Sequence, residues 1–103
     1  MKVEDMECLL PESLDISTVL DSASDYKAWL TQDTHQIQID ASHVNRLDAA
    51  GLQALLALFL SAKSNQIDIQ LVKPTPLLIE GINTLGLRDQ FEINSEVGEL
   101  QHD

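Results

Sequence analysis

Apolar and polar side chains alternate in several short segments of the chain. Residues 36–40 alternate strictly, and residues 6–10 and 68–72 are short segments rich in apolar side chains. This spacing predicts β-strands with a buried face. A break at residues 11–13 is expected before a second short extended piece through Leu14, and a last short strand is expected over residues 90–93.

Between these strands, apolar residues recur at helical spacing. One helix is expected to begin at a cap formed by Asp15 or Ser17 and to end near residues 33–35. A second is expected from Asp48 to Ser64, and a third from Pro76, which suits a first helical turn, to a stop at Gly86. Strands that alternate with helices predict an α/β fold, with a mixed, mostly parallel sheet of about four to five strands and helices packed against it.

The second helix is apolar on more than one side. Between Ala49 and Ala62 only Gln53 and Ser61 carry polar side chains. A helix of this kind must be covered on two faces, and the sheet is expected to cover the stripe of Leu52, Leu55, Leu56 and Phe59. The opposite strip is then predicted to bind a partner protein, unless a neighbouring helix covers it or its alanines only favour helix formation. This strip consists of Ala54, Ala57, Leu58, Ser61 and Asn65.

Charge narrows the range of partners. Seventeen acidic and six basic side chains give a formal net charge of −11, which repels nucleic acids and anionic lipid surfaces. We therefore expect no nucleic-acid binding and no membrane insertion. The acidity serves solubility or steers the protein toward a basic partner.

The chain is expected to be a single cytoplasmic domain over residues 1–103, with a short acidic tail at about 95–103. It has one cysteine, Cys8, which is predicted to be a small buried hydrophobe and excludes an internal disulfide. The N-terminus lacks the pattern of a signal peptide, and the longest apolar run, residues 54–60, is too short to span a bilayer.

Catalytic patterns are lacking in the sequence. Asp40 and Lys73 resemble part of a phosphoacceptor receiver domain, but the segment 9–12 offers only one acid where a receiver needs a magnesium-binding pair. No nucleophile turn, phosphate-binding glycine loop or metal-ligand spacing is found in the sequence. We expect a protein that is not an enzyme and that needs no metal or cofactor.

The segment from strand 37–41 through Leu47-Asp48-Ala49-Ala50-Gly51-Leu52-Gln53 resembles the signature of STAS domains, the regulators typified by anti-anti-sigma factors. The resemblance continues through residues 67–76 and 83–91. It is greatest toward small stand-alone STAS proteins encoded alongside bacterial chemotaxis components, and it implies the α/β sandwich of that family.

The resemblance also implies a site. In phosphorylation-switched members a serine or threonine follows the aspartate at the helix start, and here that position is Ala49, followed by Ala50. The protein is therefore expected to act without phosphorylation there. Asp48 is expected to cap the helix and to contact a partner. The loop before the helix is expected to extend the same surface through Ser42, His43, Asn45 and Arg46.

Two functions follow from the resemblance. The first is an adaptor that docks on a kinase, an anti-sigma factor or a chemotaxis protein. The alternative is a small STAS subunit bound to the ATPase of a phospholipid-trafficking ABC transporter. A homodimer through Ala54, Ala57 and Leu58 is a further option, and binding of a small nucleotide or lipid near Asp48 rests on fold analogy alone.

Overall fold

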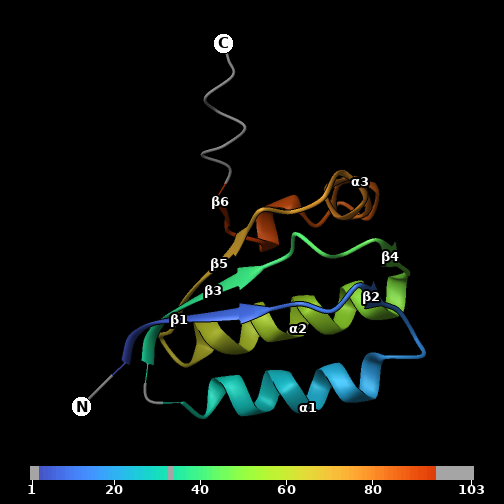
Figure 1. Ribbon diagram of the computed structural model, residues 1–103. Coiled ribbons are helices and arrows are strands. Elements are labelled where there is room, and N and C mark those ends of the chain that lie inside the picture. Colours follow the sequence, from blue (N-terminus) through green and yellow to red (C-terminus); the bar gives the residue numbers. More distant parts are fainter. Residues whose placement is uncertain (1–2, 33, 95–103) are drawn as a thin grey trace.

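The structure is a computed structural model, and it describes residues 3–32 and 34–94. Strands and helices alternate along the described chain (Figure 1). In chain order the elements are β1 (Val3–Leu9), β2 (Ser13–Leu14), α1 (Val19–Leu30), β3 (Thr34–Asp40), β4 (Arg46–Leu47), α2 (Ala49–Ser64), β5 (Asp68–Val72), α3 (Pro76–Thr84), the 3-10 helix η1 (Arg88–Gln90) and β6 (Ile93–Asn94).

The main sheet has four strands in the order β1-β3-β5-β6, and every neighbouring pair is parallel. Cys8, Ile39, Leu71 and Ile93 form one row across the four strands. A separate two-stranded sheet pairs β2 with β4, also in parallel. The expected α/β class with a mostly parallel sheet is confirmed.

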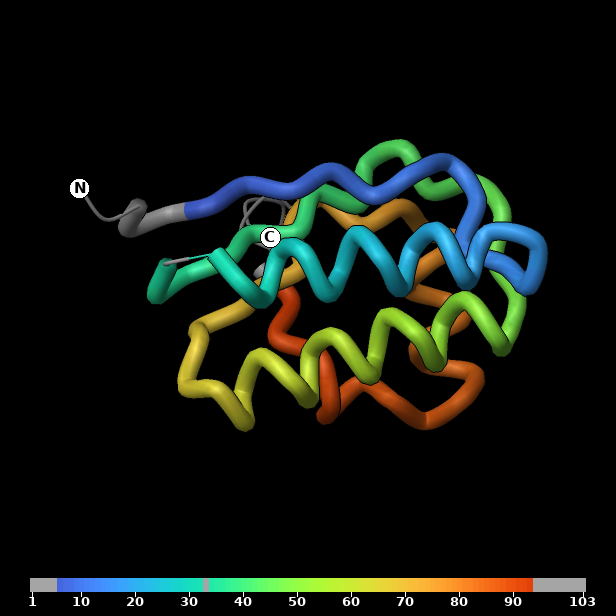
Figure 2. Tube along the Cα trace, turned by 90° about the horizontal axis from the view of Figure 1, so that it is seen from below, coloured from blue at the N-terminus to red at the C-terminus, as the bar shows by residue number. Residues whose placement is uncertain are grey.

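Helices α1 and α2 run side by side below the main sheet and begin at the same end of the molecule (Figures 1 and 2). Helix α3 lies farther from α1 than α2 does (Figure 1). The core between sheet and helices is aliphatic, with Ile37, Ile39, Leu55 and Phe59 fully buried. Such burial supplies most of the stability of a domain of this size.

Local sequence signals explain where two of the helices begin and end. Asp48 caps α2, and Thr75 caps α3 immediately before Pro76, the first helical residue. Gly86 follows α3 with a φ of 69°, a conformation that glycine adopts without steric cost. The bounds expected for α2, β5 and the start of α3 agree with the structure.

The start and end of α1 were predicted wrongly. Its N-cap is Thr18, and the side chain of Asp15 instead accepts hydrogen bonds from the backbone N–H and hydroxyl of Ser17. The helix ends at Leu30, because Thr34 already belongs to β3.

Two short elements also differ from the sequence prediction. Arg46–Leu47 forms strand β4 rather than continuing the loop. Within residues 90–93, the end of η1 comes first and β6 begins only at Ile93. A two-residue strand carries no periodicity of its own, so only its pairing partner reveals it. The acidic tail at 95–103 lies outside the described residues.

Candidate partner-binding site at helix α2

Asp48 ties the start of α2 to the segment before α1. Its Oδ1 accepts a hydrogen bond from the Gly51 N–H at 2.9 Å, and its Oδ2 accepts one from the Ile16 N–H at 3.0 Å. The backbone N–H of Asp48 donates to the carbonyl oxygen of Leu14 at 3.1 Å. These amide donors, Gly51 first and Ile16 next, lower the pKa of the Asp48 carboxyl group. The predicted capping role is present, and the bond to Ile16 adds a cross-link between distant segments.

Gly51 allows this close approach. A Cβ atom at position 51 would overlap the carbonyl oxygen and carbon of Leu14. Glycine is therefore required for β2 to lie directly against the first turn of α2. The contact fixes the helix start relative to the small β2–β4 sheet.

Ala49 is the first residue of α2 and is exposed. Ala50 is partly buried. Nearby, Ile16 is 68% exposed although its backbone is bonded to Asp48. Small and apolar side chains thus lie at the surface of a helix start that backbone contacts hold in place.

The loop between β3 and β4 is anchored by backbone hydrogen bonds and by the fully buried side chain of Val44. The N–H groups of Asn45 and Arg46 both donate to the carbonyl oxygen of Glu12, at 2.8 and 3.0 Å. Ser42 donates its N–H to Oδ1 of Asp40 at 2.9 Å. The side chains of Ser42, His43, Asn45 and Arg46 are all exposed.

Ser42 and His43 are placed close to the end of β3. Hydrogen bonds from Ser42 lower the pKa of Asp40 most, and the positive charges of Lys73 and His43 lower it further. These residues therefore gather where β3 ends, whereas Arg46 lies on β4 directly before Leu47 and the capping Asp48. The predicted loop surface thus divides into two parts.

Leu58 is not on an exposed strip, so the predicted position is wrong. It is only 2% exposed, and it lies with Ala54, Ala57 and Ser61 along a hollow whose opposite wall is α1. Helix α1 supplies Tyr26 and three further residues to that wall. Within the predicted strip, Ala57 and Ser61 remain exposed and Ala54 is partly buried. A homodimer that uses Leu58 directly is not available in this fold.

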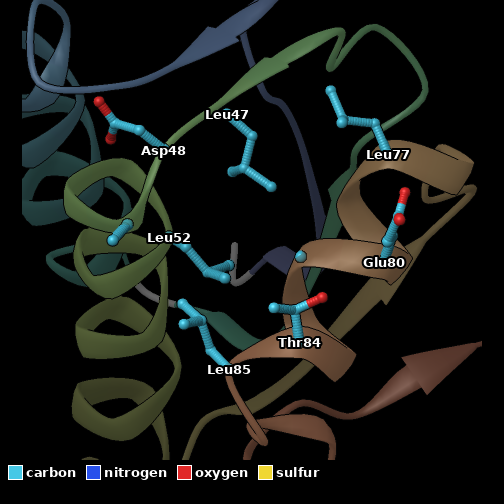
Figure 3. Close-up of a pocket in the computed structure, with 9 residues that line it drawn as sticks. Leu47, Asp48, Leu52, Leu77, Glu80, Thr84 and Leu85 are labelled. Atoms are coloured by element: carbon cyan, nitrogen blue, oxygen red, sulfur yellow. The ribbon is translucent and has the colours of Figure 1, made fainter.

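A groove runs along the other side of α2, toward α3. Its first part has a volume of about 280 Å³, and Leu47, Leu52 and Leu85 point toward the space between the two helices (Figure 3). Its second part has a volume of about 310 Å³, and Leu85 lines both parts. We call this the α2–α3 groove. It is lined by Leu47, Asp48, Ala49, Leu52, Leu77, Glu80, Gly81, Thr84 and Leu85 in the first part and by Gln53, Leu56, Ala57, Leu60, Leu85 and Leu87 in the second.

Sequence reasoning missed the leucines of this groove. Leu60, Leu77 and Leu85 are 40–46% exposed. Leu60 lies outside the expected core stripe, and Leu85 follows α3, whose buried residues are Leu78 and Ile82. The signal in the sequence was the surplus of leucines on α2, which one buried face cannot accommodate.

Within residues 3–32 and 34–94, no cluster of three or more acidic, histidine or cysteine side chains is arranged to hold a metal ion. Over the same part of the chain, no helix has the length and apolar character needed to cross a membrane.

Comparison with known proteins identifies the family. A family model described as "Mlab, STAS domain" matches residues 7–95, so the chain belongs to the STAS domain family. Among solved structures, the anti-sigma factor antagonist SpoIIAA in its unphosphorylated form is similar, with a TM-score of 0.68 and 16% identity over 94% of this chain and 85% of that chain.

The Bacillus cell fate determinant SpoIIAA in its phosphorylated form has a TM-score of 0.64 and 16% identity over 94% of this chain and 88% of that chain. At this identity the similarity shows the shared fold. No curated protein matches the sequence.

Proposed function

We propose that this STAS domain is a non-enzymatic regulatory module that docks on a signalling protein through the N-terminal end of α2. The partner class is a kinase, an anti-sigma factor or a chemotaxis component. The observation that carries the proposal is the exposed position of Ala49 directly after the capping Asp48, whose carboxylate also accepts a hydrogen bond from the backbone of the exposed Ile16.

The rigidity of the helix start supports this role. Asp48 and Gly51 fix α2 against β2 and the turn before α1, so the exposed surface needs little reorganisation on binding. A pre-organised surface loses less conformational entropy when a partner binds.

The module acts without control by phosphorylation. Ala49 stands at the position where the family resemblance implies a phosphoacceptor, and neither Ala49 nor the following Ala50 has a hydroxyl group. Thr75 is engaged in capping α3 through the Leu78 N–H. A stoichiometric phosphate on Ser42, Ser61 or Thr75 in cells would contradict this part of the proposal.

Affinity capture from native lysate tests the proposal with three variants. Ala49→Glu adds a charge that favours the helix start yet opposes an apolar contact, so it should remove the partner while keeping the fold. Ala49→Ser and Ala28→Glu are the controls, since Ala28 is also exposed but lies on α1. Selective loss of a signalling protein with Ala49→Glu supports the proposal. Loss of an ABC ATPase would favour the transporter subunit instead, and unchanged capture would refute the proposed surface.

A further inference from the structure

We infer that the α2–α3 groove receives an amphipathic helix of the partner, with an apolar face that fills the groove and basic side chains along its edge. This inference rests on the proposed function, because it names the element that the partner contributes. Ala49, at the centre of the proposed surface, also lines the groove. The groove therefore continues the proposed docking surface along α2.

The dimensions of the groove fit a helix. Along α2 it extends from Ala49 to Leu60, which at about 1.5 Å per residue is roughly 16 Å, or three helical turns. Half-exposed leucines lie along it, with Leu77 and Leu85 on the α3 side and Leu60 toward the far end of α2. An incoming helix that presents apolar residues at i, i+3 or i+4, i+7 and i+11 would cover this distance.

The charges of the groove favour a basic helix. The charged residues among its lining are Asp48 and Glu80, and within the described chain no lysine or arginine lines it. The Asp48 carboxylate is turned toward the segment before α1, whereas Glu80 lies on α3 beside Leu77 (Figure 3). Arg88 and Asp89, which follow Leu87 in the chain, carry opposite charges. A lysine or arginine at the edge of a docked helix would meet Glu80.

The same charges disfavour two other occupants. A second copy of the chain would bring its own formal charge of −11 and a second Glu80. An anionic lipid headgroup would be repelled by Glu80 for the same reason. A basic amphipathic helix satisfies both the apolar lining and the acidic edge.

The test uses a fluorescein-labelled 14-residue peptide with leucines at helical spacing and lysines beside them, and a second peptide with glutamates in place of the lysines. Fluorescence anisotropy gives the affinity, and ¹⁵N–¹H spectra locate the site. The lysine peptide should bind, with shifts concentrated at α2 and α3, and the glutamate peptide should bind at least tenfold more weakly.

Leu60→Gln and Leu85→Gln should each weaken the lysine peptide roughly three- to tenfold, since each removes the burial of half a leucine side chain. Leu9→Gln is the matched control, because Leu9 is similarly exposed (52%) but lies on β1. Glu80→Gln should weaken binding about twofold at low salt and have no effect at high salt.

The inference would be overturned if Leu9→Gln weakened peptide binding as much as Leu60→Gln and Leu85→Gln do. It would also be overturned if the spectral shifts were confined to elements other than α2 and α3, or if the two peptides bound equally well. Concentration-dependent dimerisation of the free protein that Leu85→Gln abolishes would assign the groove to a second copy instead. If the lysine peptide fails while Ala49→Glu still removes a native signalling partner, the docking function stands without the helix. If the peptide occupies the groove while Ala49→Glu leaves all partners bound, the proposed function fails instead.

Discussion

The carboxylate of Asp48 joins Ile16 to the first turn of α2, although the two residues are 32 positions apart. One oxygen caps the helix and the other holds the turn before α1, so the starts of α1 and α2 are fixed together. Both Ile16 and Ala49, the residue that follows Asp48, are exposed.

Removing the Asp48 carboxylate should destabilise the protein and loosen the Ile16 segment. In Asp48→Ala both amide bonds are lost, so the urea midpoint should fall and hydrogen exchange at Ile16 and Gly51 should accelerate. Thr75→Ala removes the cap of α3 alone, with a loss of about 1 kcal/mol, and should leave exchange at Ile16 unchanged. Unchanged protection of Ile16 in Asp48→Ala would contradict the cross-link.

The same carboxylate should contribute to stability in a pH-dependent manner. Its pKa is lower in the folded protein than the ordinary value of 3.8, so its contribution is complete above that value and is lost as the pH falls through the folded pKa. The gap in urea midpoint between wild type and Asp48→Asn should therefore be larger at pH 6 than at pH 2.5. If the difference in urea midpoint is the same at both pH values, the ionised carboxylate of Asp48 stabilises the protein no more than the asparagine amide does.

Gly51→Ala should destabilise the protein even though alanine is the better helix former. The added Cβ overlaps backbone atoms of Leu14, which cannot move without displacing β2, and the expected loss is roughly 1–3 kcal/mol. In Gly81→Ala the Cβ meets only the flexible end of the Leu47 side chain, so the free energy of unfolding should stay within about 1 kcal/mol of wild type. Chemical denaturation of the two variants makes the comparison.

Leu58 and Leu60 lie only two positions apart on α2, but their truncation should change the free energy of unfolding by different amounts. Leu58 is 2% exposed, so Leu58→Ala should cost about 2–5 kcal/mol. Leu60 is nearly half exposed, and Leu60→Ala should cost less than about 1.5 kcal/mol. Similar losses in urea denaturation would mean that α1 does not cover Leu58. Leu58→Glu, which buries a charge, is expected to unfold the protein.

The titration of Tyr26 can be used to measure how well α1 is packed, because Tyr26 is the single tyrosine of the chain. Burial raises its pKa to about 12 from the ordinary 10.0, so stability should fall as the pH rises between these values. The ultraviolet difference titration at 295 nm should show a midpoint near 12 in the folded protein and near 10 in urea. A folded midpoint near 10 would show that Tyr26 is not buried.

Short-range patterns predicted the elements that carry their own signal. The alternation before Asp40 located β3, and the Asp48 cap located the start of α2. The burial of Leu58 could not be predicted, because helical spacing gives the direction of a side chain but not which neighbour lies there. The bond from Asp48 to Ile16 and the pairing of β4 with β2 depend on segments that only the folded chain brings together.

Site-specific photocrosslinking in living cells tests the central claim most directly. A photo-reactive amino acid replaces Ala49 in one variant and Ala28, an exposed alanine of α1, in the other. The docking model predicts a discrete crosslinked signalling protein from position 49 that is absent from position 28. The absence of any crosslink from position 49 in a folded variant, or identical products from both positions, would contradict it.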